Sequence, residues 1–275
     1  MSFREELKVM PYIWKEWLEQ VRGKGLWLGL AMVMVASLFL IAEARSFPAD
    51  VGFEALLLSL FDMNIYLLPL FTMFIASFSI FQEKELKTDM ILLTKRESIV
   101  SFLFKKSIAI QFSMLATFIG VYSILSFFMI GFLSFHLTSF IHFLIVIIVF
   151  IAIFNQLGIF LGSISQTKMQ LIGVNILIWF LVVFFIDIVF IQMLSVVTFD
   201  NLRFFSWLYF LNPMHTLRFY LEVELGMFSM SHMSRLMENF VFMNPRIFLL
   251  INVFIWPIIF FGLSVLFRKR GGGRD

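Results

Sequence analysis

Six long stretches of apolar residues, each long enough to cross a lipid bilayer, dominate this sequence. They occupy residues 26–43, 55–81, 107–133, 138–163, 171–194 and 247–267. A helix of about 20 apolar residues spans a hydrocarbon core roughly 30 Å thick. Because 61% of the residues are hydrophobic and only 14% are charged, a water-soluble core could not bury this much apolar surface. We therefore expect an all-α integral membrane protein with six transmembrane helices.

The distribution of Lys and Arg predicts the orientation of these spans. Basic residues gather before span 1, between spans 2 and 3, between spans 4 and 5, and after span 6. The opposite connections hold only Arg45 and four arginines spread over the long segment 195–246. The positive-inside rule then places both ends of the chain in the cytoplasm, with the basic tail 268–275 following the last span. The net charge of +3 is explained by this topology, so we expect no nucleic-acid partner.

An amphipathic helix is expected ahead of span 1, within residues 1–25. Apolar residues from Phe3 to Val21, Trp14 and Trp17 among them, recur at steps of three or four along residues 2–22. Such a helix lies in the membrane interface with its apolar face in the lipid, and Pro11 is expected to kink it. Two roles remain open for this helix, a plain membrane anchor and a lever that transmits force.

The segment 82–98 between spans 2 and 3 begins with charges, continues with an apolar stripe and ends with charges. On this pattern alone it is either a short helix that presents its charged side to a cytoplasmic partner or a solvated loop. A second polar segment, residues 163–168, includes Gln166 and Lys168. It either contacts the same partner or forms a simple tight turn.

Segment 82–98 resembles the corresponding segment of ABC-2 type permeases. In that family an apolar span is followed by Glu-x-Glu-x-x-Thr, a Leu-rich stretch and a lysine, and the matching residues here are Glu83, Glu85, Thr88, Leu92, Leu93, Thr94 and Lys106. The six-span plan and the long segment before the last span agree with the family, whereas Lys87 stands where a Gly is usual.

The resemblance implies a type V exporter-like membrane subunit in a bacterial cytoplasmic membrane, paired with a second copy of itself. It implies a separate cytoplasmic ATPase that holds ATP and Mg²⁺, so this chain binds no cofactor. The ATPase would contact a coupling helix, and the expected coupling residues are Glu83, Lys84, Glu85, Lys87, Thr88, Gln166 and Lys168.

A narrower similarity links the chain to the NosY group of permeases. It is carried by Ile178-Trp179-Phe180, Phe185 and Asp187 and, downstream, by Leu211-Asn212-Pro213, Leu217 and Arg218, although Met214-His215 replaces a small or acidic pair. This group works with a NosF-like ATPase and an extracytoplasmic NosD-like protein in maturing the copper site of nitrous oxide reductase. The similarity implies the same partners here.

Ionisable residues in apolar spans are functional candidates because burying their charge is costly. Asp62, His142 and Asp187 all fall toward the outer side, as does Arg218 in the outer loop 195–246. They could line an outer vestibule that contacts a substrate, form structural pairs, or lie in the wet interface. A stripe of methionines at 227, 230, 233 and 237 is interpreted as the buried side of a helix, and no metal site is expected.

No ATP-binding loop is present, since the one Gly-Lys pair, Gly23-Lys24, is followed by Gly25. No catalytic constellation is evident, so we expect a permease and not an enzyme. The alternatives are an ABC-2 exporter of another substrate, such as a lipid, drug, peptide or polysaccharide, and a membrane assembly scaffold that transports nothing.

Overall fold

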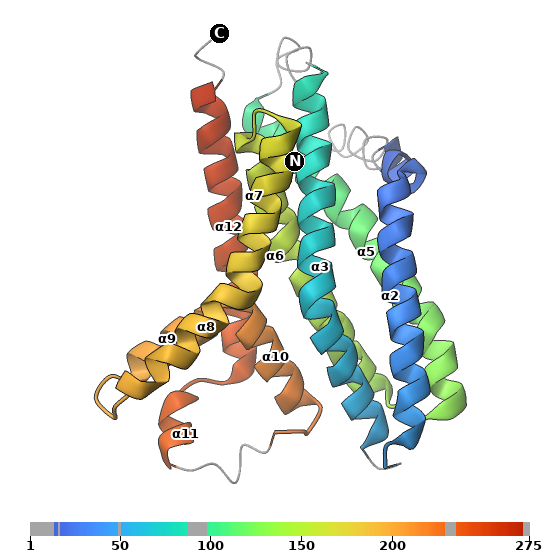
Figure 1. Ribbon diagram of the computed structural model, residues 1–275, viewed down its shortest axis with the longest axis vertical. Coiled ribbons are helices and arrows are strands. Elements are labelled where there is room, and N and C mark those ends of the chain that lie inside the picture. The colour runs from blue at the N-terminus through green and yellow to red at the C-terminus, as the bar shows by residue number, and fades with distance from the viewer. Residues whose placement is uncertain (1–13, 16, 49–50, 87–97, 229–234, 272–275) are drawn as a thin grey trace, which may run out of the picture.

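The computed structural model describes residues 14–15, 17–48, 51–86, 98–228 and 235–271, and their regular structure is helical (Figure 1). Six helices are long and apolar enough to cross a membrane, at Gly25–Ser46, Gly52–Glu85, Ile99–Phe132, Leu137–Ile164, Lys168–Val196 and Met237–Arg268. Each overlaps one of the six apolar stretches of the sequence. The prediction of a multi-pass, all-α membrane protein is therefore confirmed for the described residues.

The second, third and fourth spans are single helices, the first adds a short 3₁₀ turn, and the fifth is composite. The first four spans are α2 (Lys24–Glu43) with the 3₁₀ turn η1 (Ala44–Ser46), α3 (Gly52–Glu85), α5 (Ile99–Phe132) and α6 (Leu137–Ile164). The fifth joins α7 (Lys168–Phe180), the π-helical η2 (Leu181–Phe185), α8 (Ile186–Met193) and η3 (Leu194–Val196). The remaining helices are α9 (Leu202–Leu211), α10 (Pro213–Glu224), α11 (Arg235–Phe240) and α12 (Pro245–Gly271).

Side-chain caps determine where three of these helices begin. The oxygens of Ser98, Thr167 and Asn212 accept hydrogen bonds from the second or third backbone N–H of α5, α7 and α10, respectively. Such caps satisfy N–H groups that have no partner inside the helix. Pro213 follows the cap of α10 at the first helical position, where its missing N–H has no cost.

Helices α3 and α6 form the centre of the bundle, with α2 and α5 on one side and α12 on the other (Figure 1). Gly158 and Gly162 bring the two backbones close together. A Cβ atom at Gly158 would lie 2.6 Å from the carbonyl oxygen of Met73, and one at Gly162 would lie 2.5 Å from that of Ser77. This Gly-x-x-x-Gly face is a common means of packing helices tightly in membranes.

Buried amides link the helices around this centre. Asn155 of α6 donates to the Gln111 side-chain oxygen of α5 at 3.0 Å, and Gln156 accepts from Ser107 at 2.8 Å. Asn175 of α7 donates to the Ser77 hydroxyl of α3 at 3.0 Å. Amides inside apolar spans commonly form hydrogen bonds between helices, as these three do.

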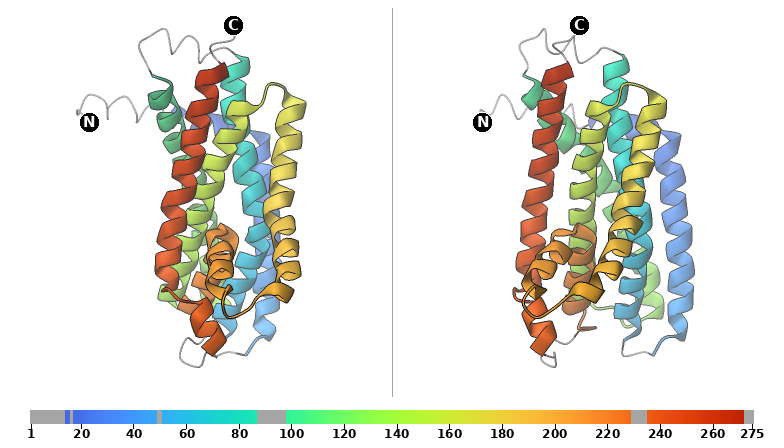
Figure 2. Two further views of the ribbon diagram at one scale, coloured as in Figure 1. Left: turned by 90° about the vertical axis from the view of Figure 1, so that its left-hand side faces the viewer. Right: turned by 60° about the vertical axis from the view of Figure 1, so that its left-hand side comes forward.

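The start of α2 and the end of α12 lie at the same end of the bundle, as an even number of spans requires (Figure 2). Residues 17–22 are helical and Gly23 separates them from α2, while residues 1–13 of the expected interfacial helix lie outside the described part. The rings of Trp14 and Trp17 meet edge to face with centroids 5.0 Å apart. We call the end where α3 and α12 finish the inner end, and the opposite end the outer end.

Candidate functional site

A buried ion pair lies at the inner end between α3 and α5. The Lys106 ammonium donates to the Glu83 carboxylate at 2.7 Å, and the two side chains are only 1% and 14% exposed. Lys106 lies seven residues into α5, which corresponds to about 10 Å of helix at 1.5 Å per residue. The carboxylate expected to face a cytoplasmic ATPase is therefore directed into the bundle.

Two further contacts tie the end of α3 to the turn between α6 and α7. The Lys84 ammonium donates to the carbonyl of Ser165 at 3.0 Å, and the Glu85 carboxylate lies 3.0 Å from the Lys168 ammonium. We call Glu83, Lys84, Glu85, Lys106 and Lys168, together with the Ser165 carbonyl, the inner charged cluster. Glu85 and Lys168 are its exposed members, with side chains 47% and 61% accessible.

The other expected coupling residues are placed only in part. The backbone N–H of Gln166 donates to the side chain of Gln170 at 2.9 Å, which closes the turn between α6 and α7. Gln166 itself is exposed. Lys87 and Thr88 lie outside the described residues.

At the outer end, α9 and α10 form a helical hairpin whose bend reaches into the bundle (Figure 1). The bend leaves two carbonyls without helical partners, and α12 supplies donors for both. Asn252 donates to the Phe210 oxygen at 2.8 Å and Trp256 donates to the Leu211 oxygen at 2.9 Å. Trp256 lies 11 residues into α12, or about 16 Å along it. Non-helical backbone is tolerated at such depth where protein surrounds it or where it lines a water-filled cavity.

Removing the Asn252 amide should weaken this hairpin. For Asn252→Leu we expect a loss of about 1 kcal/mol in the free energy of unfolding, because the buried Phe210 carbonyl loses one of its donors. Unfolding of the purified protein by SDS titration measures this loss. The control is Leu250→Ala on the exposed side of the same helix, where the Leu250 side chain is 55% accessible and a smaller change is expected.

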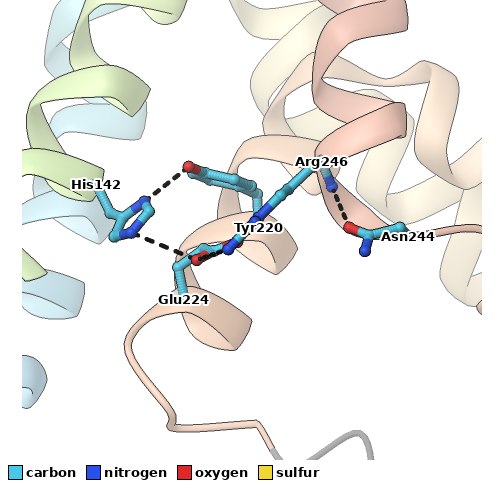
Figure 3. A network of polar contacts seen from close by, with 5 residues as sticks. All are labelled: His142, Tyr220, Glu224, Asn244 and Arg246. Atoms are coloured by element: carbon cyan, nitrogen blue, oxygen red, sulfur yellow. Dashed lines mark hydrogen bonds and ion pairs between the residues drawn. The ribbon is translucent and has the colours of Figure 1, made fainter. Parts of the chain in front are cut away.

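One polar network ties this hairpin to α6 and α12 (Figure 3). Arg246 binds Glu224 through two nitrogens at 2.6 and 2.9 Å, and hydrogen bonding to Arg246 lowers the pKa of Glu224. His142 lies 2.8 Å from the Tyr220 hydroxyl and 3.4 Å from Glu224. A bidentate Arg–carboxylate contact fixes orientation as well as adding energy. His142 is thus part of a structural network.

A second polar group lies on the other face of α10 and holds three of the four expected vestibule residues. Arg218 lies 3.5 Å from Asp62 of α3 and 3.0 Å from Glu222. Asp187 of α8 lies 3.2 Å from the imidazole of His215. The structure therefore places Asp62 beside Arg218 of α10, and Asp187 beside His215, which lies one turn before Arg218 on α10. His142 belongs instead to the network of Figure 3.

A cavity of about 520 Å³, which we call the outer pocket, opens beside this second group. Apolar residues of α8 to α11 make most of its wall, among them Ile191, Leu194, Phe205 and Phe240, and Asp187, Tyr209 and His215 supply its polar part. The His215 ring stacks on Tyr209 with centroids 4.2 Å apart. Burial, helped by nearby Arg218, lowers the pKa of His215 to about 4, so this imidazole is neutral at pH 7.

The methionine stripe was expected on a buried helix face, and the two members that are described do not support that expectation. Met227 is 43% exposed, and Met237, which lines the outer pocket, is 40% exposed. They lie on either side of a break in the described chain and belong to different segments. Met230 and Met233 lie outside the described residues.

Comparison with known proteins does not assign the chain to a family. No protein-family model matches the chain, and no curated protein matches it.

Sequence reasoning missed several residues that organise the outer end, notably His215, Glu224, Arg246, Asn252 and Trp256. Asn252 and Trp256 carried a usable signal, because two hydrogen-bonding side chains four residues apart lie on one face of a helix. In an apolar span such a face predicts a polar partner inside the protein. Glu224 and Arg246 carried no comparable signal, since their pairing depends on how α10 folds back.

Proposed function

We propose that this chain is the membrane-spanning permease subunit of an ABC transporter, driven by a separate cytoplasmic ATPase. The inner charged cluster is the observation that carries this proposal. It links the end of α3 to α5 and to the turn between α6 and α7. Force applied where α3 ends would thus reach three further helices. The expected coupling segment, 82–98, begins in the last turn of α3, and its residues 87–97 lie outside the described part of the chain.

The distribution of charge supports an inner end that faces the cytoplasm. Lys84, Lys105, Lys106, Lys168 and Arg268 all lie where α3, α5, α7 and α12 begin or end at that side. At the outer end Arg218 and Arg246 are paired with carboxylates, and Arg45 lies over the ring of Phe132 at 3.6 Å. Enrichment of Lys and Arg at the cytoplasmic ends of spans orients membrane proteins whether or not the side chains are paired, so N-in and C-in is the orientation we propose.

A second copy of the chain completes the proposed transporter. The span Lys168–Val196 is the least buried of the six, with 11% of its most apolar window inside the protein. Two such spans facing each other would form a translocation path that six helices cannot enclose alone. The NosY-like role, with a NosD-like partner outside and copper-site maturation as the task, is the narrower form of this proposal and rests on the residues around Trp179 and Asn212.

A scaffold that transports nothing is the second candidate, and the rigid outer end favours it. The α9–α10 hairpin is fixed to α12 by the Asn252, Trp256 and Arg246 contacts, and to α6 by the contacts of His142 with Tyr220 and Glu224. Such an outer surface could recruit an extracytoplasmic protein without moving a solute.

Affinity purification from native membranes tests the proposal. The tagged chain, solubilised in a mild detergent, should retain an ATPase with a phosphate-binding Gly-x-x-x-x-Gly-Lys-Ser/Thr loop, identified by mass spectrometry, and a second copy of itself. Recovery of the chain with no ATPase after chemical crosslinking in intact membranes would contradict the permease and leave the scaffold.

The exposed members of the inner charged cluster should affect coupling more than stability. For Lys168→Glu we expect a several-fold loss of ATPase stimulation in the purified complex, because two carboxylates would then face each other at the proposed contact surface. The free energy of unfolding should change by less than about 1 kcal/mol, since exposed ion pairs contribute little. Restored stimulation in Lys168→Glu/Glu85→Lys would assign the effect to this pair, whereas unchanged stimulation in the single variant would remove both residues from the coupling surface.

A further inference from the structure

The outer pocket combines an apolar wall with one polar side. Its volume of about 520 Å³ is within the range of roughly 300–1,000 Å³ that is common for small-ligand sites. Two of its apolar residues, Ile191 and Leu194, are 64% and 67% exposed on α8 and η3, a face that borders lipid in a single copy of the chain and the path between copies in the proposed dimer. A hydrocarbon chain could therefore enter the pocket sideways from the outer leaflet.

The charges next to the pocket favour a cation. Asp62, Asp187 and Glu222 bring three carboxylates to the region, and Arg218 is engaged by two of them, Asp62 and Glu222. Asp187 is the carboxylate that lines the pocket, and its side chain is 53% exposed.

The contact nearest to Asp187 does not neutralise it. His215, at 3.2 Å, is uncharged at pH 7 because burial lowers its pKa. Arg218 is engaged by Asp62 and Glu222 instead. A carboxylate beside an apolar cavity, with no closely paired cation among the described residues, attracts a positively charged group more strongly than it would in water.

We propose that the outer pocket binds a single-chain cationic amphiphile, with its ammonium group at Asp187 and its hydrocarbon chain between α8, α9 and α11. Tyr209, whose ring stacks on His215, also lines the pocket. This inference goes beyond the permease proposal, since binding requires neither ATP nor an ATPase. A second copy of the chain or an ordinary acyl chain would be the competing occupants.

Photolabelling of the full chain in lipid nanodiscs tests the site. The probe is hexadecylamine with a diazirine in its alkyl chain, and mass spectrometry locates the labelled residues. We expect the label on residues of α8, α9 and α11 that line the pocket. Unlabelled hexadecylamine should compete several-fold better than hexadecanol or hexadecyl sulfate, as expected for one charge contact at a partly exposed site.

Two pairs of variants separate the charge from the shape of the pocket. Asp187→Asn should reduce pocket labelling several-fold, whereas Asp200→Asn, on the exposed turn before α9, should not change it. Ile191→Trp should block the pocket, whereas Ile188→Trp, equally on the exposed side of α8 but away from the cavity, should not.

Label spread evenly over lipid-facing residues, no label in the pocket, or equal competition by hexadecyl sulfate would each overturn the proposal. None of these results depends on an ATPase, so a failure here leaves the permease proposal intact. Conversely, loss of the ATPase in affinity purification would leave the binding site intact.

Discussion

Replacing Lys106 by Met should destabilise the protein by about 3–5 kcal/mol, the usual cost of leaving one charge of a buried pair without its partner. The Glu83 carboxylate is 14% exposed and would lose an ammonium group at 2.7 Å. Met retains much of the apolar stem, so the loss reports the charge more than the packing. An SDS unfolding titration of the purified protein measures it.

A double-mutant cycle assigns this effect to the pair. The double variant Glu83→Gln/Lys106→Met should lose less free energy of unfolding than the two single variants lose together, by roughly 0.5–3 kcal/mol. The reason is that the buried charge is removed together with its partner. Lys168→Met is the matched control at the same end of the bundle, where an exposed pair is broken. Additive single effects, or an equal loss in Lys168→Met, would contradict a buried and energetically important Glu83–Lys106 pair.

The second large effect is expected at Gly158, where α3 and α6 touch. Gly158→Ala would place a methyl group 2.6 Å from the Met73 carbonyl and 2.8 Å from the Ala76 side chain. Backbone atoms cannot turn away, so the two central helices must separate. We expect a loss of about 1–3 kcal/mol in the free energy of unfolding, the usual cost of overpacking.

Gly120→Ala on α5 is the control for helix propensity. A methyl group there meets no atom within 4 Å, so the change should be neutral or stabilising by up to about 1 kcal/mol. Opposite signs for the two glycine variants would support the tight α3–α6 contact. A neutral Gly158→Ala would mean that the two helices are further apart than described.

The membrane-spanning plan could be predicted from the sequence because apolar length determines a span almost directly. The predicted limits of the second and third spans were nevertheless too narrow, since α3 continues to Glu85 and α5 already begins at Ile99. Charged residues do not end a helix; they only end the part of it that lies in hydrocarbon. Glu83, Lys84 and Lys106 fall in these extensions.

The arrangement of the outer end could not be predicted, because it depends on contacts between distant residues. Depth along the spans placed Asp62, Asp187 and His142 on the same side, yet their partners come from α10, which reads as part of a loop. Arg218 and His215 reach them only because the hairpin folds back into the bundle, and that fold depends on donors supplied by α12.

Helix α3 runs between the inner and the outer end of the proposed transporter. Its last turn carries Glu83, Lys84 and Glu85 of the inner charged cluster, and Asp62 lies toward its start beside Arg218. Since α3 also packs tightly against α6, a movement imposed at the inner end would be transmitted along a stiff pair of helices. Movement at the outer end on ATP binding is therefore the central expectation.

A distance measurement between two copies of the chain tests that expectation most directly. The sequence contains no cysteine, so Phe204→Cys, at an exposed position on α9, introduces one spin label per copy. In the purified complex with its ATPase, the distance between the two labels should shift between the nucleotide-free state and the state trapped with ATP and vanadate. The same distance in both states, or no coupling between labels at all, would contradict an ATP-driven dimeric permease.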